Sequence, residues 1–177
     1  MVNRSLEVGL DSQCLSYIID ALEGIAEPTD SLAEQRVALV RIFLYRLGTL
    51  WTTPTVKREF ERIGEPTRRA KHQSWTSVLF GVYPLNDPEA VWRRATELGK
   101  HHPDIDDCLV LAEAEDIGLA NLLSFDTQFV NHLSDHARLN LARPVPYWES
   151  LRVPRGERPN KIPWPDNPLA AQAWWGW

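Results

Sequence analysis

The stretch from Pro103 to Phe129 constrains the fold more than any other part of the chain. It predicts a helix that begins among clustered acids, which can accept hydrogen bonds from the free N–H groups of a helix start, and that ends at Gly118. The apolar segment from Leu119 to Phe125 predicts a short buried parallel strand, and Asp126 follows it. Ligand sites of open α/β sheets lie at the carboxyl ends of strands. An acid at a helix start and an acid at a strand end can therefore meet at one edge of a sheet. The clustered acids are Asp104, Asp106 and Asp107.

The beginning of the chain follows the same order of strand, acid and helix. The segment from Leu6 to Leu10 predicts a strand that ends at Asp11, and the apolar residues after it recur at helical spacing. A second short strand is expected over residues 49–52. Thr53 and Pro54 after it are typical of a helix N-cap and a first helical residue. Because strands alternate with helices, the chain is predicted to be an α/β protein with a mainly parallel sheet.

Further elements are expected from apolar periodicity and from the residues that start and stop helices. They are, in order, a helix from Asp30 or Ser31 to about Leu47, a break at Glu65-Pro66, a strand over residues 78–85, a helix that starts at Asp87-Pro88-Glu89, a helix from about Thr127 and a last strand near residues 139–145.

Composition narrows the class of protein. The chain has 177 residues, which suits one domain with a sizeable core. Its net charge of −5 argues against a protein that coats nucleic acid by bulk charge, but it is compatible with an acidic metal site. Two cysteines are too few for a disulfide scaffold or a thiolate zinc site. No signal peptide or membrane-spanning stretch is visible, so we expect a cytoplasmic protein without a membrane partner.

Four acids stand out by their positions relative to the expected strands and helices. Asp11 and Asp126 end strands, Asp107 lies at the start of a helix, and Glu59 lies early in the helix after the second strand. Four ionised carboxylates at one edge of a sheet would repel one another, and a bound divalent cation relieves that repulsion. Hard oxygen ligands favour Mg²⁺ or Mn²⁺ over Zn²⁺. Such ions can activate water and stabilise the departing oxygen of a phosphodiester.

Four motifs around these acids occur in order along residues 6–150. They are Leu10-Asp11-Ser12 with Leu15, residues 52–59 (TTPTVKRE), residues 107–114 (DCLVLAEA), and residues 122–126 (LLSFD) with Phe129. Each motif is weak by itself, but the ordered set is fairly specific. With these motifs the sequence resembles the PIN-domain family of metal-dependent ribonucleases, and among them the VapC-like toxins of toxin–antitoxin pairs.

The resemblance implies a fold, a reaction and a set of site residues. The fold is a three-layer α/β/α arrangement over residues 1–152, with a sheet in the order 3-2-1-4-5. The reaction is hydrolysis of RNA by metal-activated water, and the implied partners are RNA, an antitoxin and a second copy of the chain in a homodimer. The implied roles are metal ligands for Asp11, Asp107 and Asp126, a fourth catalytic acid for Glu59, and support by hydrogen bonding for Ser12 and Ser124.

Several positions keep two interpretations. Asp11 by itself could be only a helix cap, Glu59 could be an exposed helix acid, and Asp104 is the alternative to Asp107. The only compact basic cluster is either a solvated face or a contact for RNA phosphates. His101 and His102 are expected at the surface. The basic cluster contains Arg68, Arg69 and Lys71.

The C-terminal segment and the function each have more than one interpretation. Residues 153–177 form a Pro- and Trp-rich extension that folds back on the domain, joins a dimer interface or docks a partner. The alternative to the ribonuclease is a catalytically silent PIN-like module that binds RNA or protein. A phosphatase that uses Asp11 as its nucleophile is disfavoured, because Gln13 stands where the acid–base partner is usually found.

Overall fold

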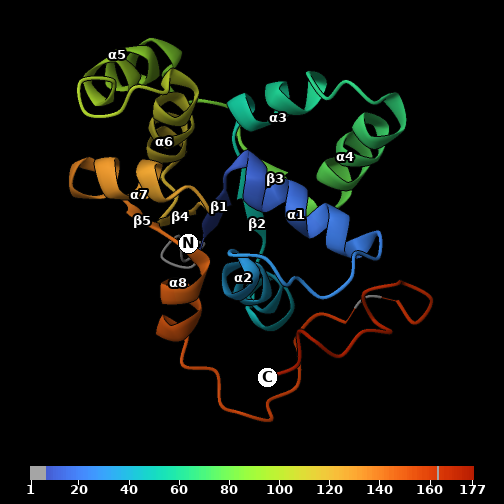
Figure 1. Cartoon of the computed structure of the whole chain (residues 1–177). Helices are drawn as coiled ribbons and strands as arrows, with labels where there is room; N and C mark the ends of the chain where they lie inside the picture. The colour runs from blue at the N-terminus through green and yellow to red at the C-terminus, as the bar shows by residue number, and fades with distance from the viewer. Residues whose placement is uncertain (1–6, 163) are drawn as a thin grey trace.

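The computed structural model describes residues 7–162 and 164–177. Within them the chain forms a five-stranded, all-parallel sheet in the order β3-β2-β1-β4-β5 (Figure 1). The strands are β1 (Val8–Leu10), β2 (Leu50–Thr52), β3 (Phe80–Val82), β4 (Asn121–Leu123) and β5 (Asn140–Ala142). Helices flank the sheet in a three-layer α/β/α arrangement. The predicted fold class and strand order are therefore confirmed.

Eight α-helices occur in the described residues. They are α1 (Ser12–Leu22), α2 (Ala33–Tyr45), α3 (Pro54–Glu61), α4 (Pro66–Leu79), α5 (Pro88–Leu98), α6 (Ile105–Ile117), α7 (Thr127–Leu133) and α8 (Pro144–Ser150). Two pairs pack most extensively, α5 with α6 and α2 with α8, and they lie in different parts of the molecule (Figure 1). In the part of the chain that the structure describes, no helix is long and apolar enough to cross a membrane.

The central strands are buried on both faces, as parallel strands covered by helices must be. In β1, Val8 and Leu10 are fully buried, and in the neighbouring β4 Leu122 and Leu123 are fully buried. The register pairs Leu10 with Leu123, so both strands end at the same edge of the sheet. This alignment brings the residues that follow the two strands together.

The helix termini follow the expected capping chemistry at most positions. The Asp87 carboxylate accepts hydrogen bonds from the first N–H groups of α5, and Asp104 does the same for α6. Gly118 ends α6 with a φ of 81°, a left-handed conformation that glycine adopts without a steric penalty. The start and end of α6 are thus set by local sequence.

Between β2 and β3 the structure differs from the prediction at two points: a further helix follows the expected break, and the expected strand is shorter. Pro66 does not simply end a helix, because it is the first residue of α4, and the Glu65 carboxylate caps that helix by accepting from the N–H groups of Thr67 and Arg68. The segment expected as a strand from Val78 begins with the last residues of α4, so β3 is only Phe80–Val82. Proline has no backbone N–H, and the first residue of a helix needs none. Pro66 can therefore follow the end of one helix and begin the next.

Other boundaries also differ from the sequence prediction. The helix expected from Asp30 or Ser31 begins at Ala33 and ends at Tyr45. Thr53 occupies the N-cap of α3, but its hydroxyl makes no capping hydrogen bond. The strand expected to reach residue 145 ends at residue 142, because Pro144 begins the unpredicted helix α8. Leu6, expected in the first strand, lies outside the described residues.

The C-terminal extension folds back on the helices α2 and α8. The Trp177 indole donates to the backbone oxygen of Val153 at 2.8 Å and meets the ring of Trp148 edge-on. Arg41 of α2 donates to the backbone oxygen of Gly176 at 2.6 Å, and Leu169 is fully buried. Of the three alternatives for this segment, the structure supports packing against its own domain.

Candidate active site at the acidic edge of the sheet

Asp11 and Asp126 lie at the same edge of the sheet because their strands are neighbours. Asp11 follows β1 directly, and its N–H donates to the backbone oxygen of Leu123 at 3.0 Å. Asp126 follows β4 after two residues and caps α7 with one carboxylate oxygen. Ser124 lies between them, fully buried, and its hydroxyl oxygen accepts from the Asp126 N–H at 2.9 Å. Each strand therefore delivers an acid to the rim at which parallel sheets hold ligands.

The Asp11 carboxyl group is buried in a way that disfavours its charge. It is 6% exposed, and burial raises its pKa from 3.8 to about 6. Hydrogen bonds with the Ser124 hydroxyl and from the Cys14 N–H, at 2.7 Å, oppose that rise, while the charge of Asp107 adds to it. A carboxyl group with this pKa holds its negative charge at a cost at neutral pH.

Asp107 occupies the first turn of α6 and faces several charged groups. Burial raises its pKa, and the charges of Asp104 and Asp126 raise it further. The imidazole of His102 opposes this rise by hydrogen bonding, with its Nε2 atom 2.8 Å from Asp107 Oδ2. Asp107 thus interacts electrostatically with the acids that follow both central strands.

Glu59, in α3, is the fourth acid of this group. Burial raises the pKa of its carboxyl group, the charges of Asp106 and Asp107 raise it as well, and a hydrogen bond with the Ser12 side chain lowers it. Glu59 lies in α3, which is attached to α6 by a buried carboxylate. Glu113 of α6 is 2% exposed and accepts at 2.8 Å from both the backbone N–H and the hydroxyl group of Thr55. No local pattern singles out Glu113, although this residue positions the helix that carries Glu59.

The four predicted acids are thus coupled electrostatically, but they are not arranged as a finished coordination sphere. Among residues 7–162 and 164–177, no three His, Cys, Asp or Glu side chains could hold a metal ion as they stand. One oxygen of each aspartate is engaged by the protein: Asp11 by the Cys14 N–H, Asp107 by His102, and Asp126 by the first N–H groups of α7. In the described residues the other oxygen of Asp107 and of Asp126 accepts no hydrogen bond, whereas the Asp11 carboxyl group also contacts the Ser124 hydroxyl.

His102 is a residue of this edge that the sequence analysis placed wrongly. It was expected at the surface with His101, but it is 4% exposed and contacts Asp107 as well as His132, whose Nδ1 atom lies 3.2 Å from its own. No local pattern marks this burial, because it depends on α7 packing beside the loop that precedes α6. Asp104, the alternative to Asp107, caps α6 with its side chain.

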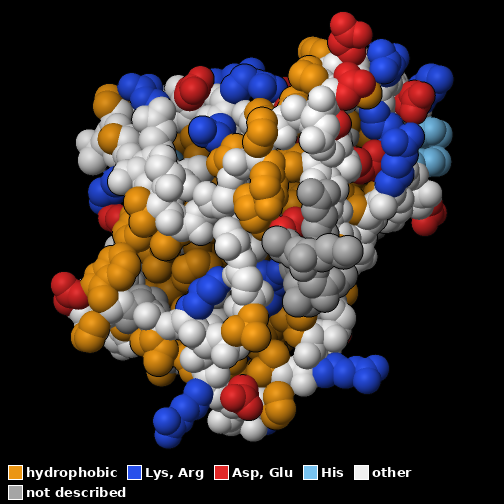
Figure 2. Space-filling view, turned by 180° about the vertical axis from the view of Figure 1, so that it is seen from behind, with side chains coloured by type: hydrophobic (Ala, Val, Ile, Leu, Met, Phe, Trp, Pro, Cys, Tyr) orange, Lys and Arg blue, Asp and Glu red, His pale blue; other side chains and the backbone are white. Residues whose placement is uncertain are grey.

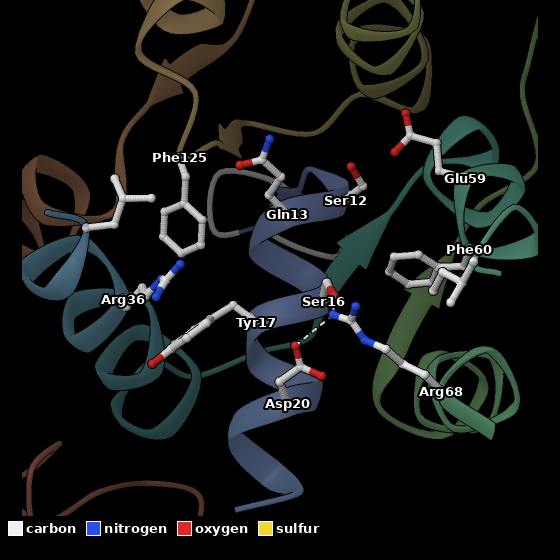
Figure 3. A pocket seen from close by; sticks show the side chains of 12 residues that line it. Ser12, Gln13, Ser16, Tyr17, Asp20, Arg36, Glu59, Phe60, Arg68 and Phe125 are labelled. Carbon is white, nitrogen blue, oxygen red and sulfur yellow. Dashed lines mark hydrogen bonds and ion pairs between the residues drawn. The ribbon is translucent and has the colours of Figure 1, made fainter. Parts of the chain in front are cut away.

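A cavity of about 400 Å³ adjoins the acidic edge (Figure 3). Ser12 and Glu59 line it at the end of the acidic edge, and Tyr17, Arg36 and Phe125 line another side. The hydroxyl group of Tyr17 and the Nε atom of Arg36 are buried without a hydrogen-bond partner among the described residues. Figure 3 shows the α1 helix running beside this cavity from Ser12 to Asp20. Of the four acids only Glu59 lines this cavity, which places cationic and aromatic groups on the same surface as Glu59.

The members of the basic cluster have different hydrogen-bond partners, although Arg68 and Lys71 also line one small cavity together. Arg68 lines the cavity, where its guanidinium group lies 3.0 Å from Asp20 and 3.2 Å from the Ser16 hydroxyl (Figure 3). Arg69 donates to the backbone oxygen of Ile63, and Lys71 pairs with Glu23 at 2.5 Å. Arg68 is the member of this cluster that lines the same cavity as Glu59.

Comparisons with known proteins bear on the fold. No family model and no curated protein sequence matches the chain. The crystal structure of FitAcB from Neisseria gonorrhoeae matches with a TM-score of 0.50 and 14% sequence identity, over 77% of this chain and 97% of that chain. At this identity, the match shows a similarity of fold.

Proposed function

We propose that the protein is a divalent-metal-dependent ribonuclease of the PIN-domain type. The observation that carries this proposal is the electrostatic coupling of its acids at one edge of the sheet. Burial and mutual repulsion raise the pKa of Asp11, Glu59 and Asp107, and the charge of Asp126 contributes to the rise at Asp107. Clustered carboxyl groups with raised pKa values are typical of functional sites, and one of the four acids, Glu59, also lines the adjoining cavity.

The donor chemistry of this edge suits Mg²⁺ or Mn²⁺. Carboxylate oxygens are the ligands that these ions prefer, and the carboxylates of Asp11, Asp107 and Asp126 are those that would hold the ion. A bound divalent cation would lower the pKa of a water molecule and stabilise the charge on the departing oxygen of a phosphodiester. The proposed reaction is hydrolysis of an RNA phosphodiester bond by that water.

The chain's own residues have separate proposed roles. Glu59 orients the attacking water from α3, with Ser12 holding its carboxyl group by hydrogen bonding. Ser124 supports Asp11 and Asp126 from between them. His102 is a positioning residue, because its contact with Oδ2 of Asp107 leaves Oδ1 for the ion.

The cavity beside the acidic edge is the proposed path of the RNA strand. Arg36 and Arg68 are the cations that line it, and guanidinium groups bind phosphate oxygens by charge-assisted hydrogen bonds. Tyr17 and Phe125 are aromatic residues on which bases could stack. In this arrangement one phosphate lies at the acids while the adjoining nucleotides occupy the cavity.

Replacing Arg68 with Ala should weaken RNA binding by about five- to tenfold and reduce the salt dependence of binding by about one phosphate contact. The protein should remain folded, because the exposed ion pair of Arg68 with Asp20 contributes little stability. Fluorescence anisotropy of a labelled RNA at several salt concentrations, in EDTA, measures both quantities. Arg93→Ala on α5, a similarly exposed arginine, is the control. An unchanged affinity and salt slope for Arg68→Ala would exclude Arg68 from the RNA path.

Metal-dependent cleavage is the direct test of the proposed activity. Purified protein is incubated with a mixture of structured RNAs in Mg²⁺, in Mn²⁺ and in EDTA, and the fragments are separated by size. Cleavage with metal that EDTA abolishes supports the ribonuclease. If folded protein cuts none of these RNAs with either metal, the silent binding module becomes the better interpretation.

We further propose a toxin role with an antitoxin partner, which rests on the motifs that resemble VapC-like toxins. Expression of the wild-type protein in a bacterial host should then arrest growth, whereas expression of Asp107→Asn at the same level should not. Optical density after induction, with immunoblots to match the two protein levels, is the measurement. Normal growth with abundant wild-type protein that cleaves RNA in vitro would instead favour an RNA-processing enzyme.

A further inference from the structure

A second cavity, of about 500 Å³, lies at the opposite edge of the sheet. It is formed by the end of α1, the loop between α2 and β2, the end of α4 and the C-terminal extension. Figure 2 shows hydrophobic side chains gathered around a hollow on this side of the molecule. Its apolar lining consists of Leu22, Phe43, Val78, Leu79, Ile162 and Trp164. A cavity of this volume and lining is typical of sites for small apolar ligands.

The rim of this cavity exposes more apolar surface than isolated surface residues would. Val78 is 73% exposed, Ile162 is 70% exposed and Trp164 is 48% exposed, although all three line the same cavity. Trp164 is also held in place, because its ring stacks on that of Trp75 with centroids 5.5 Å apart. Contiguous exposed apolar side chains around a hollow indicate a binding surface.

Two cations lie beside this apolar cavity without an acidic partner. Lys161 lines it, with its Nζ atom 2.7 Å from the backbone oxygen of Gly48 and 5.6 Å from the Phe43 ring centroid. Arg46 contacts the backbone oxygen of Thr49, a lining residue, at 3.5 Å. No carboxylate lies within 4.0 Å of either cation in the described residues.

Because Arg46 is buried, its lack of an acidic partner is unfavourable in free energy. Its side chain is 6% exposed, and its Nε atom has no hydrogen-bond partner among the described residues. The positive charge of Arg46 also lowers the pKa of the nearby Lys161 ammonium group, in addition to the larger effect of burial. Buried cations are normally paired. An anion at this position would supply the missing partner to both.

We infer that this cavity binds a small amphiphile, with its apolar body among the side chains of the cavity and a carboxylate head paired with Lys161 and Arg46. The inference is independent of the proposed nuclease activity, because it uses none of the residues at the acidic edge. A carboxylate satisfies the geometry of a guanidinium group and carries a single charge into a largely apolar cavity. The volume of the cavity favours such a ligand over an extended partner surface.

Isothermal titration calorimetry with decanoate, below its micelle concentration, tests the inference on the full-length protein. Decanoate should bind with saturation, and about tenfold more tightly than 1-decanol, which has the same chain without the charge. Lys161→Ala should weaken decanoate binding by about tenfold and leave 1-decanol binding unchanged. Lys100→Ala, an exposed lysine after α5, is the matched control and should bind decanoate like the wild type.

A second variant covers the case in which Lys161→Ala disturbs the extension. Val78 is exposed, so Val78→Glu should fold normally, and its added carboxylate should weaken decanoate binding by about tenfold through repulsion at the rim. Absence of saturable decanoate binding, equal affinity for decanoate and 1-decanol, or unchanged binding to both variants would each overturn the inference. A change of oligomeric state in Val78→Glu with decanoate binding unaffected would overturn it in favour of a contact between protein chains.

Discussion

Replacing Asp107 with Asn should reduce metal-dependent RNA cleavage by on the order of a thousandfold. The substitution removes a proposed metal ligand together with its negative charge, which raises the pKa of both Asp11 and Glu59. The helix should be retained, since Asp104 rather than Asp107 caps α6. Initial rates of cleavage of one defined RNA in Mn²⁺ measure the effect, and circular dichroism shows whether the variant is folded.

Asp106→Asn is the matched control for this prediction. Asp106 precedes Asp107 in the same turn of α6 and its carboxylate lies 3.3 Å from the Arg62 guanidinium group. It is not among the proposed metal ligands, so its cleavage rate should stay within a few-fold of the wild type. Equal losses in the two variants would mean that general negative charge matters rather than a ligand at position 107. Full activity of Asp107→Asn would remove Asp107 from the site.

Replacing Asp11 with Asn should stabilise the metal-free protein at pH 8 while it abolishes cleavage. Asparagine can still accept the Cys14 N–H and cap α1, but it carries no charge into the buried site. Raising the pKa of a carboxyl group from 3.8 to about 6 on folding corresponds to a cost of about 3 kcal/mol once the group is ionised in both states. Asp11→Asn should recover about that free energy of unfolding.

The stabilisation should depend on pH in a defined direction. Below pH 3.8 the carboxyl group is protonated in the folded and the unfolded chain, so the substitution gains nothing. Between pH 3.8 and about 6 the unfolded chain ionises first, and the wild-type protein loses stability as the pH rises. The gain should therefore grow through this window and stay constant above it. Urea unfolding in EDTA at a series of pH values measures it.

Asp87→Asn provides the same chemical change at another helix N-cap. Asp87 caps α5 at the exposed surface, so its replacement relieves no buried charge and should not stabilise the protein at pH 8. If Asp11→Asn destabilised the protein at pH 8, the carboxylate would be contributing hydrogen bonds that outweigh its burial. The prediction that the Asp11 carboxylate lowers the stability of the metal-free protein would then be wrong.

Local sequence was sufficient to predict where Asp11 and Asp126 lie relative to the strands and helices. Asp11 and Asp126 each follow a short apolar segment and precede a helix, and the parallel topology then requires their strands to end together. Asp104 and Gly118 mark the two ends of α6 by capping chemistry, which acts within a few residues. These features depend on neighbours in the chain, so a sequence pattern can specify them.

Other features depend on contacts between distant segments. His102 is buried against His132 and Phe129 of α7, and Glu113 is buried against Thr55 of another helix. Pro66 shows the limit of local rules, because proline is compatible with the break after one helix and with the start of the next. No periodicity distinguishes these cases.

The sequence by itself determined the α/β class, the order of acids along the chain and the caps that begin α5 and α6. The tertiary structure alone decided which residues form hydrogen bonds with those acids and where the C-terminal extension lies. It also decided that Arg46 is buried beside an apolar cavity. The physical reason is the distance along the chain over which each effect acts. Propensity, capping and alternation act over a few residues, whereas burial and its effect on pKa depend on what the whole chain packs against each group.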